Sequence, residues 1–521
     1  GSLTIDAACA SSLYAIKLAC DALADGRVDA MLAGGVSRPE CLYTQIGFSQ
    51  LQALSRSGVC RPFDARADGL IVGEGAGVFL LKRLDDAERD GDEIHGVIRG
   101  IGLSNDQAGS LLAADSAGQL RALRAAYEQA GWSPCDVDLI ECHGTGTPLG
   151  DAVELQSLAT LRRQAGSPDM PPCVIGSVKS NIGHTLTAAG AAGLMKVLLA
   201  MRHRQLPPTA GFEQPASTAP LESASLRILQ QPQPWPQRDE RTPRRAAISA
   251  FGFGGINAHL LVEESPARVA TDRVVSAASL TTASATRNPR ADEPVAIVGM
   301  DARFGRLDSL AEFREAVFRG RSAIEPRPAD RWFGDERSIA PLADALPKNG
   351  ALLDSVRITP GAFRVPPAEL PDILPQQLLM LVSAAAAMDD AGLPRRGDRP
   401  RHSVLIGMAL DLNTTNYHLR WVLERWARAW ARRRGLRLND GEFDRWLAEL
   451  RDACGPPLTS PRVLGALGNI VASRIAREFG FGGPSYALSA DAASGLHALE
   501  IARRALTHHE IDCALVGAVD L

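Results

Sequence analysis

The stretch TIDAACASSLYAIKLACDALA, residues 4–24, holds the local pattern on which both the fold and the site depend. Its first residues read as a strand already in progress, a run of small residues follows, and Ser11–Ala24 has the composition of a helix. Cys9 therefore stands at or near a helix N-terminus, where unpaired amides and the helix dipole favour a thiolate. Taken alone, a cysteine among small residues is more often a buried structural residue.

Two further motifs place histidines at junctions between a strand and a helix. The motif ECHGTGT, residues 141–147, puts His143 in a glycine turn that follows a strand. The motif VKSNIGH, residues 178–184, brings Lys179 and His184 just ahead of a predicted helix. Either histidine alone would more often be structural. With Cys9 at a third junction, these residues predict a nucleophile with two imidazoles on loops at one edge of a sheet.

A fourth motif, AFGFGGINAH at residues 250–259, supplies a glycine-rich turn whose amides could face an oxyanion, although such a turn alone is weak evidence. Together and in this order, the four motifs resemble those of the β-ketoacyl synthases of the thiolase-like superfamily. The resemblance covers residues 1–264. It implies an α/β fold with five layers in the order α/β/α/β/α.

The resemblance also implies a reaction and a set of roles. Cys9 would take an acyl chain from a phosphopantetheine thioester, and a malonyl-type extender on an acyl carrier protein would lose carbon dioxide and attack it. His143 and His184 would stabilise the enolate of the extender, and Lys179 would hold the histidine-bearing loop. The other implied contacts are an oxyanion hole formed by the amides of Cys9 and Phe253, and contacts of Thr145 and Thr147 with the pantetheine arm. Two histidines favour decarboxylative synthesis over thiolase chemistry, which uses a second cysteine as a base.

Composition narrows the class of protein. The chain has 521 residues, of which 45% are hydrophobic and 22% charged, as in globular domains with a sizeable core. A net charge of −4 gives no electrostatic case for nucleic acid or an anionic membrane. Nine scattered cysteines without a C-x-x-C pair argue against disulfides and a zinc site, so we expect no metal, no tightly bound cofactor and a cytoplasmic location.

The chain divides at a segment, residues 265–293, that is rich in Ala, Ser, Thr and Arg and is predicted to be a linker. On either side the sequence alternates strands with helices. The predicted strands are Asp29–Ala33, Val78–Leu81, Val137–Glu141, Val174–Ser177, Leu260–Glu263 and a strand VAIVGM that begins at Val295, and the predicted helices are Ser11–Ala24, Gln119–Ala130 and Thr187–Met201.

The two sides are copies of one unit. ALSADAASGLHALEIARRAL, which ends at Leu506, resembles the opening stretch, and aligning Leu13 with Leu496 gives an offset of 483. We therefore expect two incomplete tandem copies. Residues 1–264 would lack about the front 189 residues of a complete unit, and residues 294–521 would be a front half. The chain is expected to be a piece of a longer protein.

The second copy has Ala492 where the first has Cys9, so it cannot form an acyl-enzyme. A synthase followed by a cysteine-less copy resembles the synthase and chain-length-factor pairs of polyunsaturated-fatty-acid and polyketide type I megasynthases. The expected partners are an acyl carrier protein, a pairing of synthase with chain-length factor or a homodimer, and other domains of the same megasynthase. The alternatives are a decaying duplicate, a non-catalytic scaffold, a thiolase-type or decarboxylase use of the site, and a second copy whose front completes the first.

Overall fold

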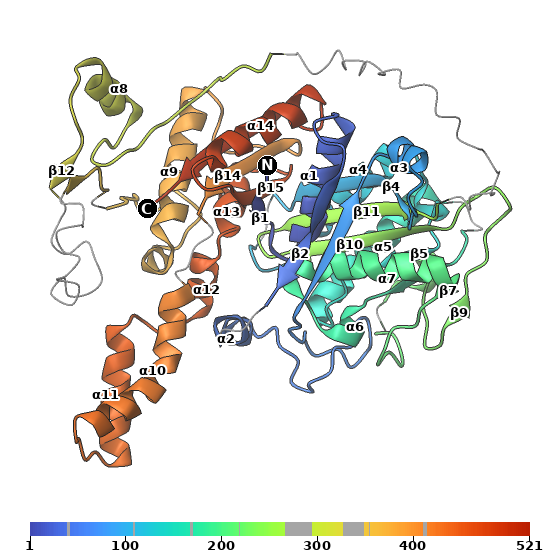
Figure 1. The fold of residues 1–521 in the computed structure, drawn as a ribbon, viewed down its shortest axis with the longest axis horizontal. Helices are drawn as coiled ribbons and strands as arrows, with labels where there is room; N and C mark the ends of the chain where they lie inside the picture. The colour runs from blue at the N-terminus through green and yellow to red at the C-terminus, as the bar shows by residue number, and fades with distance from the viewer. Residues whose placement is uncertain are drawn as a thin grey trace.

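The computed structural model describes residues 1–38, 42–107, 110–166, 170–217, 219–265, 294–326, 349–353, 355–409 and 414–521. Apart from residue 265, the predicted linker lies outside the described residues. Below, the first copy means residues 1–264 and the second copy means residues 294–521. Figure 1 shows the first copy as the larger layered body and the second copy beside its N-terminal strand.

The first copy is built on a six-stranded sheet with the order β4-β11-β10-β5-β6-β8. Consecutive residues of a strand point to opposite faces. Ile248 and Leu260 accordingly belong to the core on one face, and Ala247 and Leu261 to the core on the other. The strands are β4 (Val97–Asn105), β5 (Leu139–Glu141), β6 (Cys173–Gly176), β8 (Leu226–Ile228), β10 (Arg245–Gly252) and β11 (Ile256–Glu263).

Helices cover both faces of this sheet and give the layered arrangement of a thiolase-like α/β fold. One face carries α4 (Ser116–Ala130) and α5 (Pro148–Ala165), and the other carries α1 (Ser11–Ala24) and α7 (Ala189–His203). Beyond α1 lies a second, antiparallel sheet of β2 (Met31–Ser37) and β3 (Gly75–Leu81). The smaller elements are α2 (Leu42–Gln50), α3 (Leu84–Asp90), α6 (Lys179–Ile182), β7 (Gln205–Leu206), β9 (Gln233–Pro234), and the 3-10 turns η1 (Ala8–Ala10), η2 (Pro134–Asp136), η3 (Leu186–Ala188) and η4 (Glu222–Ala224).

Most predicted elements of the first copy are confirmed within a few residues. The helix predicted at Ser11–Ala24 has these bounds in the structure, and the predicted strand at the N-terminus is β1 (Thr4–Asp6). The strand predicted at Val295 is wrong: residues 294–303 form no strand, and Ile297 is 80% exposed. In the sheet of the second copy, β14 (His402–Met408) and β16 (Cys513–Val519) pair directly with each other over seven residue pairs. The segment at Val295 lies outside this sheet, and the Met300 N–H donates to the Asp390 carboxylate at 2.9 Å rather than to a strand.

The two copies meet edge to edge. Strand β1 pairs antiparallel with β15 (Ser485–Ser489), and this places Ile5 opposite Leu488, which lies 483 positions later in the chain. Because this is the offset of the repeat, equivalent residues face each other at the centre of the pairing, as they would on a two-fold axis. The equivalent helices α1 and α14 (Ser494–Thr507) lie side by side above it (Figure 1). Tyr14 and Tyr486 stack edge to face at 5.2 Å in a core that both copies share.

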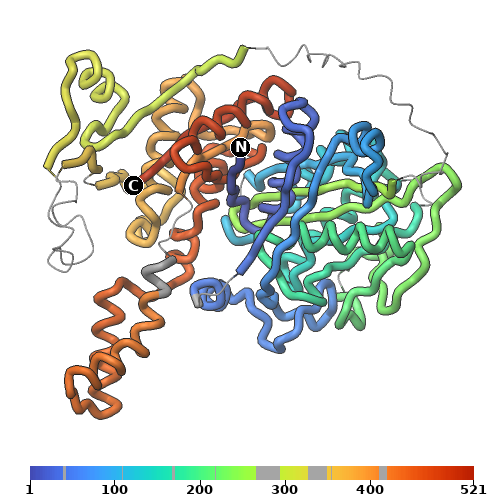
Figure 2. The backbone as a smooth tube through the Cα atoms, in the orientation of Figure 1, coloured from blue at the N-terminus to red at the C-terminus, as the bar shows by residue number. Residues whose placement is uncertain are grey.

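The second copy keeps its own sheet, in which β14 lies between β15 and β16. Its front therefore does not complete the first copy, as the alternative interpretation required, but packs beside it. Helices α9 (Pro375–Asp390) and α13 (Ile470–Phe479) cover one face of this sheet and α14 the other, while α10 (Thr414–Arg433) and α11 (Asp440–Ala453) project away as a hairpin (Figure 2). The remaining elements are α8 (Leu310–Phe318), β12 (Glu325–Pro326), β13 (Asn349–Gly350), η7 (Pro367–Asp372) and α12 (Ser460–Ala466).

Among the described residues, no helix is both long and apolar enough to cross a bilayer. The cysteines in the described part of the chain are free.

Candidate active site

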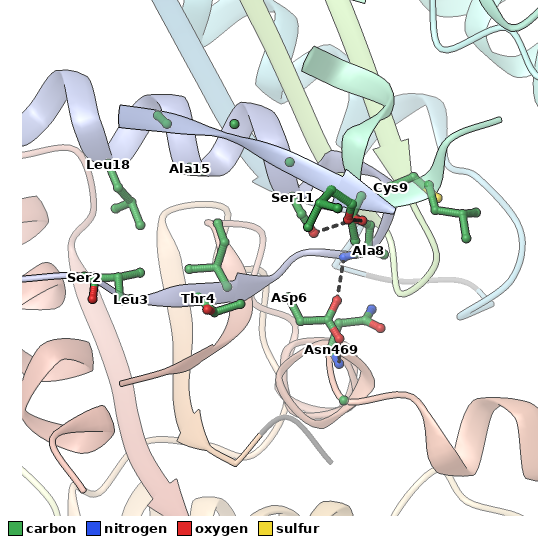
Figure 3. A pocket seen from close by; sticks show the side chains of 18 of the residues that line it. Ser2, Leu3, Thr4, Asp6, Ala8, Cys9, Ser11, Ala15, Leu18 and Asn469 are labelled. Atoms are coloured by element: carbon green, nitrogen blue, oxygen red, sulfur yellow. Dashed lines mark hydrogen bonds between the residues drawn. The ribbon is translucent and has the colours of Figure 1, made fainter. Parts of the chain in front are cut away.

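The turn that carries Cys9 has a strained backbone. Ala8 has a φ of 48°, a left-handed value that is uncommon for a residue other than glycine. The Ser11 hydroxyl holds this turn by accepting from the Ala7 amide at 3.0 Å and donating to the Ala8 carbonyl at 2.6 Å. The Asp6 carboxylate accepts from the Ala8 amide at 3.0 Å, as Figure 3 shows. These bonds fix Cys9 in the 3-10 turn immediately before α1.

The second copy repeats this turn without the nucleophile. Asp491, the equivalent of Ala8, has a φ of 53°, and Ser494 makes the same two bonds that Ser11 makes. Ala492 stands at the cysteine position, is exposed and has no thiol. The backbone geometry of the nucleophile turn is therefore independent of the cysteine itself.

The structure brings the predicted nucleophile and both predicted histidines together. His184 Nε2 lies 3.1 Å from Cys9 Sγ, and the rings of His143 and His184 are 5.3 Å apart and nearly perpendicular. The Phe251 amide donates to His143 Nδ1 at 3.2 Å, so the proton of the neutral His143 ring resides on Nε2. His184 Nδ1 has no hydrogen-bond partner among the described residues, so its tautomer is free to change.

Burial keeps both imidazoles neutral. It lowers the pKa of His143 well below the ordinary value, and Lys179 and the neighbouring His184 add to the effect. The pKa of His184 is lowered in the same way by burial and Lys179. Neutral imidazoles can donate one N–H to a developing negative charge without carrying a charge of their own.

Burial also acts on Cys9, against the prediction that the helix N-terminus favours a thiolate. It raises the pKa of the thiol from 9.0 to about 12, although Lys179 works in the opposite direction. Three pKa units correspond to ~4 kcal/mol. A helix dipole contributes only ~0.3–1 kcal/mol. Desolvation therefore dominates, and Cys9 rests as a thiol beside a neutral imidazole that can accept its proton.

The protonation state of Cys9 can be checked by alkylation. We expect the rate of Cys9 alkylation by iodoacetamide to rise ~tenfold per pH unit from pH 7 to 10 without a plateau, because only the thiolate reacts. In denaturant the same peptide should reach a plateau near pH 9, the ordinary pKa of a thiol. Peptide mass spectrometry separates Cys9 from the other cysteines. A folded-state plateau below pH 9 would restore the thiolate prediction.

Two carboxylates that sequence analysis missed shape the loop that carries His143. Glu154 accepts from the amides of His143 at 2.7 Å and Gly144 at 2.8 Å, and Asp151 accepts from Thr145 at 3.0 Å and Gly146 at 3.2 Å. Burial raises the pKa of Glu154 to about 7 and that of Asp151 to about 6. Their sequence signal is two acidic residues in the first two turns of the helix that follows the motif.

Lys179 and the two threonines complete this loop. Lys179 is buried, and its ammonium donates to the carbonyl oxygen of His143, which ties the two histidine-bearing segments together. The Thr145 and Thr147 hydroxyls are 2.9 Å from each other. Thr145 is buried, and neither threonine lines the large cavity beside Cys9. Within the described residues, no group of three or more His, Cys, Asp or Glu side chains could hold a metal ion.

The turn between β10 and β11 lies against the amide of Cys9. A Cβ atom added to Gly252 would come within 2.8 Å of Ala8 Cβ and 3.0 Å of Cys9 N, so only glycine fits here. Phe253 follows directly and lines the same cavity as Cys9. The geometry places the two amides predicted to form an oxyanion hole on adjoining backbone segments.

The close approach of this turn leads to a prediction. We expect Gly252→Ala to slow acylation of Cys9 at least ~tenfold, because the added methyl group displaces the turn from the Cys9 amide. The rate can be followed with an acyl-pantetheine thioester and mass spectrometry. Gly441→Ala in α11 is the matched control, since its Cβ would meet nothing closer than 3.6 Å. Equal acylation rates in the two variants would contradict the prediction.

A cavity of about 1300 Å³ opens beside Cys9 and runs between β1 and β2. In the second copy the equivalent strands are β15 and β16, and β14 lies between them. The cavity of the first copy therefore occupies the position that β14 fills in the second copy. Only the end next to Cys9 belongs to the site, where Phe48, Leu186 and Phe253 form apolar walls. Leu467 and Asn469 of the second copy line this cavity as well.

Family models match nearly all residues of the chain. The model for "Beta-ketoacyl synthase, N-terminal domain" matches residues 1–87 and 292–521, which together exceed half of the chain. The model for "Beta-ketoacyl synthase, C-terminal domain" matches residues 95–213, and "Ketoacyl-synthetase C-terminal extension" matches residues 215–294. The last match extends past the end of β11 into the segment predicted as a linker.

Individual proteins and a solved structure are also similar to this chain. One component of the polyunsaturated fatty acid synthase of Thraustochytrium sp. is 35% identical over 525 residues, which cover 99% of this chain and 24% of that protein. A component of the phenolphthiocerol/phthiocerol polyketide synthase of Mycobacterium tuberculosis is 46% identical over 264 residues, 50% of this chain and 14% of that protein. The solved structure "PfaC Keto synthase-Chain length factor" superposes with a TM-score of 0.83 at 33% identity, over 99% of this chain and 53% of that one. The chain thus spans about a quarter of the first relative and about half of the solved structure.

Proposed function

The chain belongs to the β-ketoacyl synthase family, and on that premise we propose that it carries out a decarboxylative condensation of acyl thioesters in fatty acid or polyketide biosynthesis. The observation that carries the proposal is the arrangement of Cys9, His184 and His143, a thiol 3.1 Å from one neutral imidazole with a second imidazole beside it. The substrates are an acyl chain and a malonyl-type extender, both held as phosphopantetheine thioesters on an acyl carrier protein.

In the first step the Cys9 sulfur attacks the carbonyl carbon of the incoming acyl thioester. His184 Nε2 accepts the thiol proton, and the amides of Cys9 and Phe253 stabilise the oxyanion of the tetrahedral intermediate. The bond from the carbonyl to the pantetheine sulfur then breaks, and the proton leaves with that sulfur. The acyl chain extends into the apolar end of the cavity, which suits an aliphatic substrate.

In the second step the extender binds with its thioester oxygen between the two imidazoles. His143 donates from Nε2, where its proton is fixed by the Phe251 amide. His184 donates from Nε2 after its remaining ring proton has moved there from Nδ1, which has no hydrogen-bond partner among the described residues. Loss of carbon dioxide leaves an enolate whose carbon attacks the acyl group on Cys9. The new carbon–carbon bond forms as the bond to the Cys9 sulfur breaks, and the product is a β-ketoacyl thioester. The Cys9 thiolate that leaves takes up a proton from solvent and returns to the thiol. Lys179 holds the His143 loop, and the hydroxyls of Thr145 and Thr147 on that loop are the proposed contacts of the pantetheine arm.

For the second copy we propose the role of a chain-length factor that has no condensing activity of its own. The support is twofold: Ala492 replaces the nucleophile, and Leu467 and Asn469 contribute to the cavity beside Cys9. Asn469 connects the copies at the site itself. Its backbone N–H donates to the Asp6 carboxylate, which lies beside it in Figure 3, at 3.1 Å. Its side chain donates to the Phe253 carbonyl at 2.9 Å.

These contacts make Asn469 a positioning residue for the oxyanion turn. We expect Asn469→Ala to slow Cys9 acylation ~tenfold, because one hydrogen bond worth ~1.5 kcal/mol is lost. Asn469→Asp should be slower still, since its carboxylate would face the Phe253 carbonyl oxygen. The melting temperature, measured alongside, separates positioning from general destabilisation. Equal acylation rates for the aspartate and alanine variants would count against this role.

The proposed function is tested by incubating the full-length protein with an acyl-pantetheine thioester and mapping adducts by peptide mass spectrometry. We expect an adduct on Cys9 and none on any cysteine of the second copy. A malonyl thioester should then lose carbon dioxide and yield a β-ketoacyl product. Carbon dioxide release without an adduct would indicate a decarboxylase, and neither signal in folded protein would leave a scaffold role.

A further inference from the structure

The equivalent segments 11–27 and 494–510, which contain α1 and α14, share several apolar residues but differ in charge. At the repeat offset of 483, Leu13, Ala19 and Leu23 align with Leu496, Ala502 and Leu506. Three charged positions are instead reversed in sign: Lys17 aligns with Glu500, Asp21 with Arg504, and Arg27 with Glu510. At a fourth position Asp25 aligns with His508, which is positive only when it is protonated.

The reversed charges meet across the contact between the copies. On the approximate two-fold axis, Arg504 lies 3.1 Å from Asp21, its own equivalent, and His508 lies 3.4 Å from Asp25. Away from the axis the contacts are reciprocal. Lys17 lies 3.0 Å from Glu510. The same contact recurs between the equivalent residues, because Arg27 lies 3.8 Å from Glu500.

The inner part of this network is buried. The side chains of Lys17, Asp21 and Arg504 are 8%, 11% and 9% exposed, whereas Arg27 and Glu500 lie at the rim. Lys17 also contacts Asp21 at 2.7 Å, and Arg504 contacts Glu510 at 2.6 Å. Each buried charge is therefore paired, and an unpaired charge at these positions would be costly because it is out of water.

We propose that these reversed charges make the pairing surface of each copy selective for the other copy and reject a second copy of its own kind. Two first copies on the same axis would face Asp21 with Asp21, Asp25 with Asp25, and Lys17 with Arg27. Two second copies would face Arg504 with Arg504, His508 with His508, and Glu500 with Glu510. Like charges at a contact of this kind disfavour the wrong partner.

Part of the apolar surface is common to both copies. Ile5 faces Leu488 on the axis, and Leu13, Ala19 and Leu23 align with identical residues, so these positions fit either pairing. Tyr14, which stacks on Tyr486, aligns instead with His497. The partner that the surface selects is thus a cysteine-less copy for a cysteine-bearing one. This selectivity concerns only which copy binds which, so it does not depend on the condensing activity.

Charge exchange in the full-length protein tests the inference. One variant gives the second copy the charges of the first, with E500K, R504D, H508D and E510R. The exchanged variant adds the reverse changes in the first copy, K17E, D21R, D25H and R27E. Hydrogen–deuterium exchange of the backbone amides of β1 and β15 reports the pairing directly, since these strands bond to each other only when the copies are docked.

The one-sided variant should exchange these amides at least ~100-fold faster than the native protein, because buried like charges face each other. The eightfold variant should return to within ~tenfold of native, since every pair is restored in reverse. Reversing an exposed pair on α10, with E424R and R428E, is the matched control and should change nothing at β1 or β15. Native protection in the one-sided variant, or no recovery in the eightfold variant, would overturn the inference. Acylation of Cys9 is a separate readout, so failure here leaves the proposed function standing.

Discussion

Cys9→Ala is expected to abolish condensation while leaving decarboxylation of a malonyl thioester largely intact. The acyl chain is held only through the Cys9 sulfur, so its removal should lower condensation on the order of 10⁴-fold or more. The decarboxylation step depends instead on the N–H groups of His143 and His184, which alanine at position 9 leaves in place. We expect that rate to stay within ~tenfold of native.

The two activities can be measured on the same preparation, as acyl adduct by mass spectrometry and as carbon dioxide release from a malonyl-pantetheine thioester. Cys135→Ala is the matched control, because Cys135 lies in η2, away from the site. An acyl adduct in Cys9→Ala would mean that another residue is the nucleophile. Loss of both activities would mean that Cys9 is also needed to hold the histidines in position.

The core of this site could be predicted from local sequence because its residues lie where strands end. Cys9, His143 and His184 each follow a strand or a strand-like segment. His143 and His184 come after the neighbouring strands β5 and β6 of the six-stranded sheet, as predicted, whereas Cys9 comes after β1, which belongs to the other sheet. The helix at Ser11–Ala24 was predicted with its observed bounds, since its composition agrees with its tertiary context. Local pattern and global fold point to the same answer here.

Other features depend on how distant parts of the chain meet. Asn469 bonds to Asp6 across 463 positions, and no pattern near either residue indicates the contact. The absence of a strand at Val295 is of the same kind, since the Met300 N–H of this segment bonds to the carboxylate of Asp390, 90 positions later. The resting state of Cys9 depends on distant parts of the chain as well: a helix N-terminus can be found in the sequence, but the burial that raises the pKa of this thiol cannot.

The second large effect is expected from the different roles of the two histidines. His143→Ala is expected to slow malonyl decarboxylation ~10²–10³-fold, the usual result of removing one oxyanion donor. Cys9 acylation should stay within ~tenfold of native, because His143 does not contact the Cys9 sulfur and His184 does. His184→Ala should therefore lower both rates, and the pair of variants separates a shared role from two distinct ones.

His143→Gln sharpens the test, since it distinguishes a donated hydrogen bond from a structural effect. The glutamine oxygen can accept from the Phe251 amide, as His143 Nδ1 does, while its NH₂ group points toward the position of Nε2. If His143 acts by donating a hydrogen bond, glutamine should recover at least ~tenfold of the decarboxylation that alanine loses. A glutamine variant as slow as the alanine variant, with an unchanged melting temperature, would argue that the imidazole serves in another way, such as proton transfer. Equal loss of acylation in both variants would show instead that the His143 loop supports Cys9, through Lys179 and the segment that carries His184.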